Sequence, residues 1–222
     1  TPIIGLKIQE LLEQSGLPPG LLQTVVGGAA QGQAIIEQKP AKIFFTGSVE
    51  TGKKIAKQAA ENLIPVNLEL GGKDPMIVLP DADLDFATSA ALWGGFSNSG
   101  QVCASTERIL VHEKIAEPFL ALFKEKAEKL KQGHLPDDQK DLGFITYEKQ
   151  KQTYEAQIQE AKSAGAEFVL GGEFSEDRRT LKPTIVTGDK IESLSIYKNE
   201  TFGPVVAVTR FKTLAEAAEK AN

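Results

Sequence analysis

The chain has 222 residues, a hydrophobic fraction of 41% and a formal net charge of −5. This length allows one large domain or two small ones, and the hydrophobic fraction is typical of a globular protein. The negative charge argues against a protein that binds nucleic acid through an overall basic surface, and no apolar run approaches the ~18 residues of a membrane helix. The lone cysteine, Cys103, excludes an internal disulfide and indicates a reducing compartment such as the cytoplasm.

The first 70 residues are predicted to alternate helices and strands. A helix is expected over 2–15, because Thr1 suits its cap, Pro2 its first turn and Gly16 its exit. An apolar run at 21–26 follows, and the pattern then predicts a helix near 29–38, a strand at 42–45, a helix over 50–62 and a strand at 65–70. Such alternation is typical of a parallel sheet covered by helices, in which the loops after the strands share one edge.

A second unit is expected after the double glycine at 71 and 72, so the predicted parts are residues 1–71 and 72–222. Strands are predicted at 75–79, 108–113, 167–172, 183–188 and 204–211, and helices over 81–96, 115–131 and 147–164. The last residues again follow a helical pattern. We therefore expect an α/β protein.

A glycine loop at 44–54, "FFTGSVETGKK", nearly matches a P-loop. A P-loop needs Ser or Thr after its lysine to bind Mg²⁺, and Lys54 stands there instead. A strand followed by Gly47, Ser48 and Gly52 at a helix start still offers backbone N–H groups to an anion. The pattern leaves two interpretations, a pyrophosphate site without metal and a plain strand–helix turn.

Two further residues suit catalysis. A lone cysteine is most often a small buried hydrophobe, but Cys103 lies in the polar loop of "FSNSGQVCASTER" (96–108), where a thiolate would be a strong nucleophile. Glu69 lies between two leucines, and burial there would raise its pKa to suit a general base. Strand alternation equally allows Glu69 to point to water. His112 and His134 fit no metal spacing, so no metal is expected.

Four segments, "FTGSVETGKKI", "LELGGKDP", "GQVCASTERILV" and "NETFGPV", resemble the aldehyde dehydrogenase superfamily in order and separation. The resemblance covers essentially the whole chain. It implies an internal or C-terminal portion of a subunit about twice as long. Residues 1–71 would be part of a Rossmann-like parallel-sheet dinucleotide-binding domain. Residues 72–222 would be an α/β catalytic domain that is incomplete at its C-terminus.

The resemblance also implies a reaction, the oxidation of an aldehyde to a carboxylic acid with NAD or NADP. Cys103 would attack the aldehyde to give a thiohemiacetal, hydride would pass to nicotinamide, and Glu69 would activate water to hydrolyse the Cys103 thioester. Trp93 and Phe96 would help to shape the aldehyde tunnel. The residues implied in cofactor binding are Gly47, Ser48, Gly52, Leu70, Gly71, Gln150, Glu200 and Phe202.

Several alternatives stay open. The thioester could pass to coenzyme A instead of water, Cys103 could serve a cysteine esterase without nicotinamide, or the chain could be an inactive fragment acting as a binding or structural module. The implied partners are a small aldehyde and, for the parent protein, further copies in a homodimer or homotetramer, with neither nucleic acid nor a membrane. An oxyanion-hole asparagine and an adenine-ribose lysine would lie before residue 1. We therefore expect the 222 residues alone to be weakly active or inactive.

Overall fold

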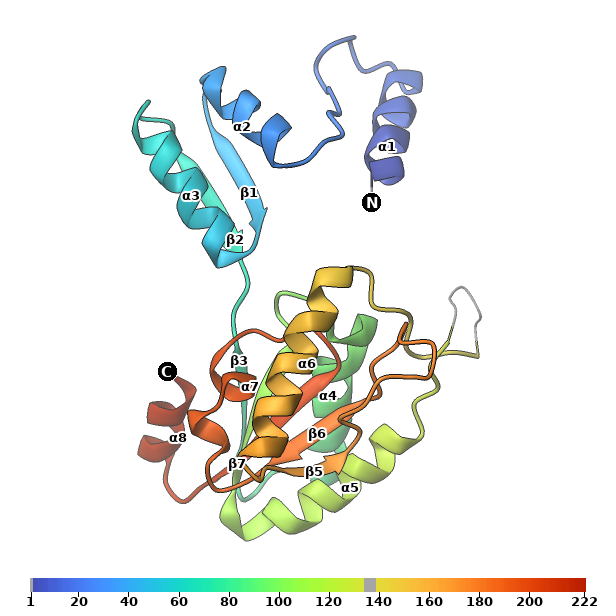
Figure 1. Ribbon diagram of the computed structural model, residues 1–222, viewed down its shortest axis with the longest axis vertical. Coiled ribbons are helices and arrows are strands. Elements are labelled where there is room, and N and C mark those ends of the chain that lie inside the picture. The colour runs from blue at the N-terminus through green and yellow to red at the C-terminus, as the bar shows by residue number, and fades with distance from the viewer. Residues whose placement is uncertain (1, 134–138) are drawn as a thin grey trace. The chain divides into compact units, whose positions relative to one another are not determined.

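The computed structural model describes residues 2–133 and 139–222, so the predicted cap Thr1 and His134 lie outside the described residues. The chain divides into two compact units, Thr1–Leu70 and Gly71–Asn222, each visible in Figure 1. The assignment of the two parts as dinucleotide-binding and catalytic domains stays a prediction.

The first unit contains a two-stranded parallel sheet and three helices. Its elements are α1 (Pro2–Gln14), α2 (Ala29–Glu37), β1 (Ile43–Gly47), α3 (Val49–Ala60) and β2 (Val66–Leu70). Strand β1 pairs with β2 from Ile43 opposite Val66 to Gly47 opposite Leu70. A small core of Ile36, Ala59 and Ile64 joins α2, α3 and the residues before β2.

The ends of the helices follow from their sequences. Gly16, with φ of 94°, ends α1 as predicted, and the N–H of Leu17 donates to the Leu12 carbonyl across this exit. At the start of α3, the Ser48 hydroxyl accepts the N–H of Thr51. The apolar run at 21–26 forms neither helix nor strand.

The second unit is built on a five-stranded sheet in the order β3-β4-β7-β6-β5. Its strands are β3 (Asp74–Val78), β4 (Thr106–His112), β5 (Glu167–Leu170), β6 (Thr184–Thr187) and β7 (Val205–Phe211). The first four strands in this order run parallel, whereas the edge strand β5 is antiparallel to β6. Its helices are α4 (Leu84–Phe96), α5 (Ala116–Glu128), α6 (Glu148–Ser163), α7 (Ser195–Lys198) and α8 (Leu214–Ala221).

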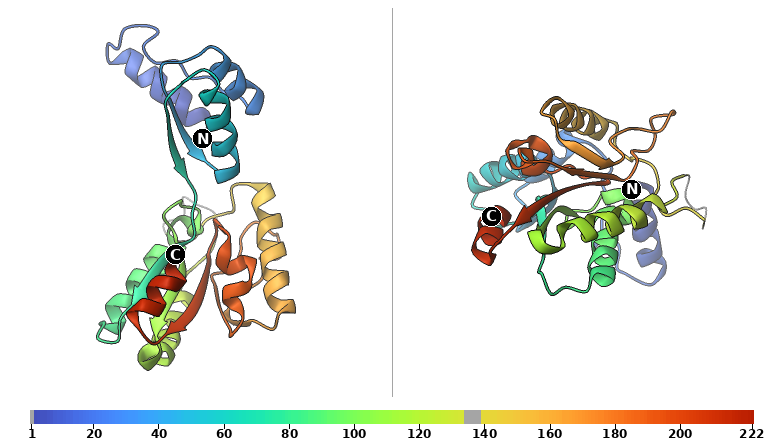
Figure 2. Two further views of the ribbon diagram at one scale, coloured as in Figure 1. Left: turned by 90° about the vertical axis from the view of Figure 1, so that its left-hand side faces the viewer. Right: turned by 90° about the horizontal axis from the view of Figure 1, so that it is seen from below.

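Helices cover both faces of this sheet, as Figure 2 shows. Strand β7 is buried on both sides, and its residues alternate between two cores. Val206 and Val208 pack with α4 and α5, whereas Val205 and Ala207 pack with α6 and α7. A strand buried on both faces is largely apolar, which explains the apolar run 205–208 that predicted it; Arg210, near the end of β7, is exposed.

The predicted helices and strands are confirmed within a few residues of their ends. The sequence pattern did not predict the short helix α7, which comprises only four residues. Among the described residues, no helix is long and apolar enough to cross a bilayer.

Candidate functional site

Three of the four motif segments meet at one edge of the second unit's sheet. Strands β3, β4 and β7 are parallel neighbours, so their amino-terminal ends lie along the same edge. The segments 71–73, 97–105 and 199–204 each lead into one of these strands. For the first 70 residues we expected the loops after the strands to gather along one edge. In the second unit the candidate residues instead stand before their strands.

Cys103 is a free, exposed cysteine in the loop between α4 and β4. The alternative of a buried hydrophobic cysteine is therefore wrong for this structure. The preceding residues Asn98, Ser99 and Gly100 all have left-handed backbones, with φ of 51°, 59° and 67°. Consecutive left-handed residues turn the chain sharply away from α4. Ser99 and Gly100 in this turn are buried, whereas residues 102–104 are exposed.

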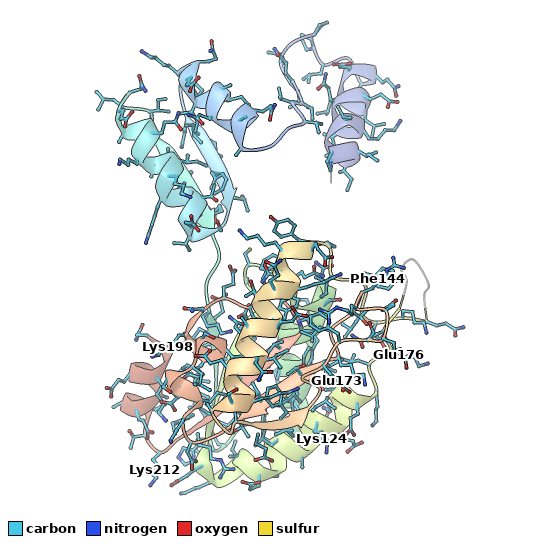
Figure 3. All side chains as sticks on the ribbon, in the orientation of Figure 1. Lys124, Phe144, Glu173, Glu176, Lys198 and Lys212 are labelled. Atoms are coloured by element: carbon cyan, nitrogen blue, oxygen red, sulfur yellow. The ribbon has the colours of Figure 1, made fainter. Side chains whose placement is uncertain are left out.

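The Cys103 loop is anchored on the segment that leads to α6. The Ser99 hydroxyl donates to the Gly143 carbonyl at 3.1 Å. The Gln101 amide donates to the carbonyl of Phe144, which Figure 3 labels, and accepts the N–H of Thr146 at 3.0 Å. These hydrogen bonds attach the Cys103 loop to residues 143–146. The position of the loop therefore does not depend on the backbone of 101–105 alone.

The same loop touches the segment 199–204. A Cβ added to Gly100 would lie 2.1 Å from the Gly203 carbonyl oxygen, which leaves no room for a side chain. The cysteine motif and the "NETFGPV" motif are therefore in backbone contact.

We expect Gly100→Ala to destabilise the protein more than Gly165→Ala. Both glycines have left-handed φ, which costs alanine about 1–2 kcal/mol, but nothing lies within 4 Å of a Cβ at Gly165. Overpacking against Gly203 should add ~1–3 kcal/mol at Gly100. Urea denaturation of both variants measures the difference, and equal losses would contradict the contact.

Glu200 lies against the double glycine that precedes β3. A Cβ on Gly71 would lie 2.0 Å from a carboxylate oxygen of Glu200, and the Gly72 N–H donates to the same carboxylate. Burial raises the pKa of the Glu200 carboxyl above its ordinary value, and the Glu107 carboxylate adds to this rise. Only glycine at position 71 allows the carboxylate and the backbone to approach this closely.

Helix α6 binds the segment 199–202 through one face. Gln150, Tyr154 and Gln157 are four and three residues apart, which places them on the same side of the helix. Gln150 donates to the Thr201 carbonyl, and the Tyr154 hydroxyl donates to the Phe202 carbonyl at 2.6 Å. Gln157 accepts the Thr201 hydroxyl at 2.9 Å. Gln150 therefore contacts the backbone of Thr201, the residue after Glu200, together with the other two residues of this helix face.

A buried ion pair that the sequence did not predict lies behind this segment. Lys73 donates to the Glu107 carboxylate at 2.5 Å, and their side chains are 6% and 3% exposed. The N–H groups of Thr201 and Phe202 donate to the same carboxylate at 2.7 and 2.8 Å. Sequence reasoning missed Glu107 because a charged residue one position before an arginine resembles a solvated pair. The signal was its place in a strand that continues with the apolar run Ile109, Leu110 and Val111.

The candidate residues of the first unit occupy the carboxyl ends of its strands. Gly47 ends β1 opposite Leu70, and Ser48 caps α3. Gly52 is buried, since a Cβ there would lie 2.6 Å from the Leu70 side chain. Glu69 is exposed on β2, pointing away from the half-buried Leu70. Of the two interpretations left open for Glu69, this structure has the one in which the side chain points to water. Because Glu69 lies in the first unit and Cys103 in the second, their pairing stays a prediction.

Trp93 and Phe96 do not share an environment. Trp93 is 77% exposed on α4, whereas Phe96 is 1% exposed and stacks on Phe123 in the core. Both side chains line a hollow, together with other residues of α4 and with residues 130, 141 and 142. Cys103 is not part of this lining. Among the described residues, no cluster of His, Cys, Asp or Glu suits a metal ion.

The model of the aldehyde dehydrogenase family matches residues 1–222. The chain belongs to this family. It is 39% identical over 223 residues to a betaine aldehyde dehydrogenase of Cereibacter sphaeroides, covering 100% of this chain and 46% of that protein. The chain thus spans about half the length of the curated relatives it matches.

Solved structures of the family have the same fold. A betaine aldehyde dehydrogenase double mutant from Staphylococcus aureus, in complex with NAD⁺ and with a BME-modified cysteine, matches with a TM-score of 0.94 and 34% identity. A 3,6-anhydro-L-galactose dehydrogenase in complex with NAP matches with a TM-score of 0.95 and 35% identity. Each match covers 100% of this chain. It covers 46% of the betaine aldehyde dehydrogenase chain and 48% of the 3,6-anhydro-L-galactose dehydrogenase chain. The predicted fold class, a Rossmann-like parallel-sheet part followed by an α/β part, is confirmed.

Proposed function

We propose that the protein carrying this chain oxidises a small aldehyde to a carboxylic acid with NAD⁺ or NADP⁺, using Cys103 as the nucleophile. One observation carries the proposal. The exposed Cys103 loop touches the 199–204 segment, and Glu200 of that segment lies against the Gly71–Gly72 backbone. A nucleophile, a carboxylate acceptor and a glycine backbone without side chains therefore border one edge of the sheet.

The residues of each unit fit a part of a dinucleotide. In the first unit, the N-terminus of α3 follows Gly47 and Ser48 and presents backbone N–H groups, which suits a pyrophosphate. In the second unit, Glu200 accepts one N–H and keeps further acceptor capacity for ribose hydroxyls. Phe202, half-buried, would pack beside the ribose, and Gln150 holds the backbone of this segment. When bound, the nicotinamide accepts the hydride that the substrate carbon loses.

The chain's own residues supply the covalent steps. The Cys103 thiolate attacks the aldehyde carbon and forms a thiohemiacetal, whose loss of hydride leaves a thioester on the sulfur. Glu69 takes a proton from water, the resulting hydroxide attacks the thioester, and the carboxylic acid leaves as the Cys103 thiolate is released; Glu69 then returns its proton to bulk water. A relative with a BME-modified cysteine supports an accessible thiol in the family.

The test is an assay of the whole polypeptide that carries these residues, because residues 1–222 alone are expected to be weakly active or inactive. Aldehyde plus NAD⁺ or NADP⁺ should increase absorbance at the reduced-nicotinamide band and release free acid. Acyl-CoA formed only when coenzyme A is added would replace hydrolysis by acyl transfer. Ester cleavage without any absorbance change would replace the dehydrogenase by an esterase. We further propose that the whole protein is cytoplasmic and forms a homodimer or homotetramer. A mass measurement in solution checks the number of subunits.

We expect Glu200→Gln to raise the dissociation constant for NAD⁺. Losing a charged hydrogen-bond acceptor costs ~1.5–3 kcal/mol, which is ~10–100-fold in affinity. Because burial raises the pKa of Glu200, its carboxylate protonates at a higher pH than an exposed glutamate. Binding should therefore weaken as the pH falls through that raised pKa, and the glutamine variant should lose this dependence.

Fluorescence titration with NAD⁺ across pH measures both effects. The control is Glu176→Gln, since Glu176 is an exposed glutamate of the same unit (Figure 3). An unchanged affinity in Glu200→Gln would remove Glu200 from the cofactor site.

A further inference from the structure

The backbone of Phe202 is left-handed, with φ of 54°. This conformation is unfavourable for a residue with a Cβ and persists only where the surroundings enforce it. Two side chains do so here. Glu107 accepts the Phe202 N–H at 2.8 Å, and the Tyr154 hydroxyl donates to the Phe202 carbonyl at 2.6 Å. The peptide that follows Glu200 is thus held from both sides.

The Glu107 carboxylate accepts more hydrogen bonds than the amide of a glutamine could accept. Its two carboxylate oxygens accept three donors, the N–H groups of Thr201 and Phe202 and the ammonium of Lys73. A carboxylate can accept all three, whereas a glutamine amide offers only one oxygen. Lys73 balances its charge and also donates to the Thr201 hydroxyl at 2.8 Å.

This cluster joins the three motifs that meet at the sheet edge. Lys73 follows the double glycine that contacts Glu200, and Glu107 lies four residues after Cys103. Thr201 and Phe202 directly follow Glu200. A shift of Glu107 would therefore move Glu200 relative to both the glycine backbone and the cysteine loop.

We infer that Glu107 is a positioning residue, which fixes the Thr201–Phe202 backbone and thereby places Glu200 to receive the cofactor ribose, while Lys73 serves as its countercharge. This inference rests on the proposed function. Glu107 touches neither substrate nor reacting atoms in this role, because its side chain is buried behind the segment it holds.

Variants of each member of the ion pair distinguish the positioning role of Glu107 from a contribution to stability alone. Glu107→Gln and Lys73→Met each leave one buried charge without its partner, and both should lower the thermal midpoint. Only Glu107→Gln removes a backbone acceptor. We expect its NAD⁺ dissociation constant to rise roughly tenfold, as for a lost charge-assisted hydrogen bond. Lys73→Met should stay within about threefold of the unmodified protein, because Glu107 keeps both N–H donors.

The double variant Lys73→Met/Glu107→Gln carries neither charge. It should regain thermal stability yet keep the weakened NAD⁺ affinity and the raised KM for NAD⁺. The KM for aldehyde and the rate of Cys103 alkylation by iodoacetamide should stay unchanged. If affinity instead recovers with stability, or if Lys73→Met binds NAD⁺ as weakly as Glu107→Gln, the ion pair is structural only and the inference is overturned.

Hydrogen exchange provides a readout that needs no variant. In the unmodified protein without cofactor, the amides of Thr201 and Phe202 should be protected, and free exchange there would overturn the inference even if no Glu107 variant folds. In Glu107→Gln these amides should exchange faster while α6 stays unchanged. An unmodified protein that binds neither NAD⁺ nor NADP⁺ would refute the proposed function. A protein that binds NAD⁺ equally in all variants would refute only the role of Glu107.

Discussion

Replacing Cys103 with serine is expected to lower the rate of aldehyde oxidation by at least ~10³-fold, the scale of loss when a covalent nucleophile is removed. A serine hydroxyl is almost the same size as a thiol, but it is scarcely ionised near neutral pH and has no base placed to activate it among the residues of its loop. The loop itself should remain intact, since its anchors are Ser99, Gln101 and Gly100. The loss would therefore belong to the sulfur.

The measurement is the steady-state rate of absorbance increase with aldehyde and NAD⁺, together with the NAD⁺ dissociation constant. The matched control is Ala104→Ser, which puts the same hydroxyl on the neighbouring exposed residue and should keep the rate within a few fold. Cys103→Ser should bind NAD⁺ normally and resist inactivation by iodoacetamide. A serine variant that oxidises aldehyde at the unmodified rate would exclude Cys103 as the nucleophile.

The fold was largely readable because its strands and helices carry strong local signals. Strand β7 begins with an apolar run at 205–208, since it faces a core on both sides, and α1 ends where Gly16 takes a left-handed backbone. The four-residue helix α7 and the antiparallel direction of β5 carry no such signal. Their conformations depend on packing between segments that are distant in sequence.

The candidate site was readable only in part, for a related reason. Motif resemblance identifies Cys103 and Glu200, but no local pattern predicts that Gly100 contacts Gly203 or that Glu107 binds Thr201. Those contacts arise because β4 and β7 are parallel neighbours in the sheet. The pattern left the burial of Glu69 open and did not predict that of Phe96, whereas the structure exposes Glu69 on an alternating strand and places Phe96 in the core. A sequence position shows what a side chain can do chemically, whereas the sheet order decides what it meets.

Replacing Glu69 with glutamine is expected to stop turnover after the first chemical step. Removing a general base costs ~10²–10⁴-fold, so hydrolysis of the Cys103 thioester should slow by that factor. Attack by Cys103 and loss of hydride come earlier and do not use this base. Rapid mixing should therefore show a burst of about one reduced nicotinamide per site, followed by a slow steady rate, as expected when an acyl-enzyme accumulates.

Mass spectrometry of the quenched Glu69→Gln variant should find the acyl group on the peptide that contains Cys103. The control is Glu61→Gln, an exposed glutamate of the same unit at the end of α3, which should turn over normally. Loss of the burst would place Glu69 before thioester formation, and an unchanged steady rate would exclude it as the base. Coenzyme A should not restore the rate, because restoration would show that the thioester passes to a thiol and not to water. Because Glu69 is exposed on β2, water can reach its carboxylate, as the role of a general base in hydrolysis requires.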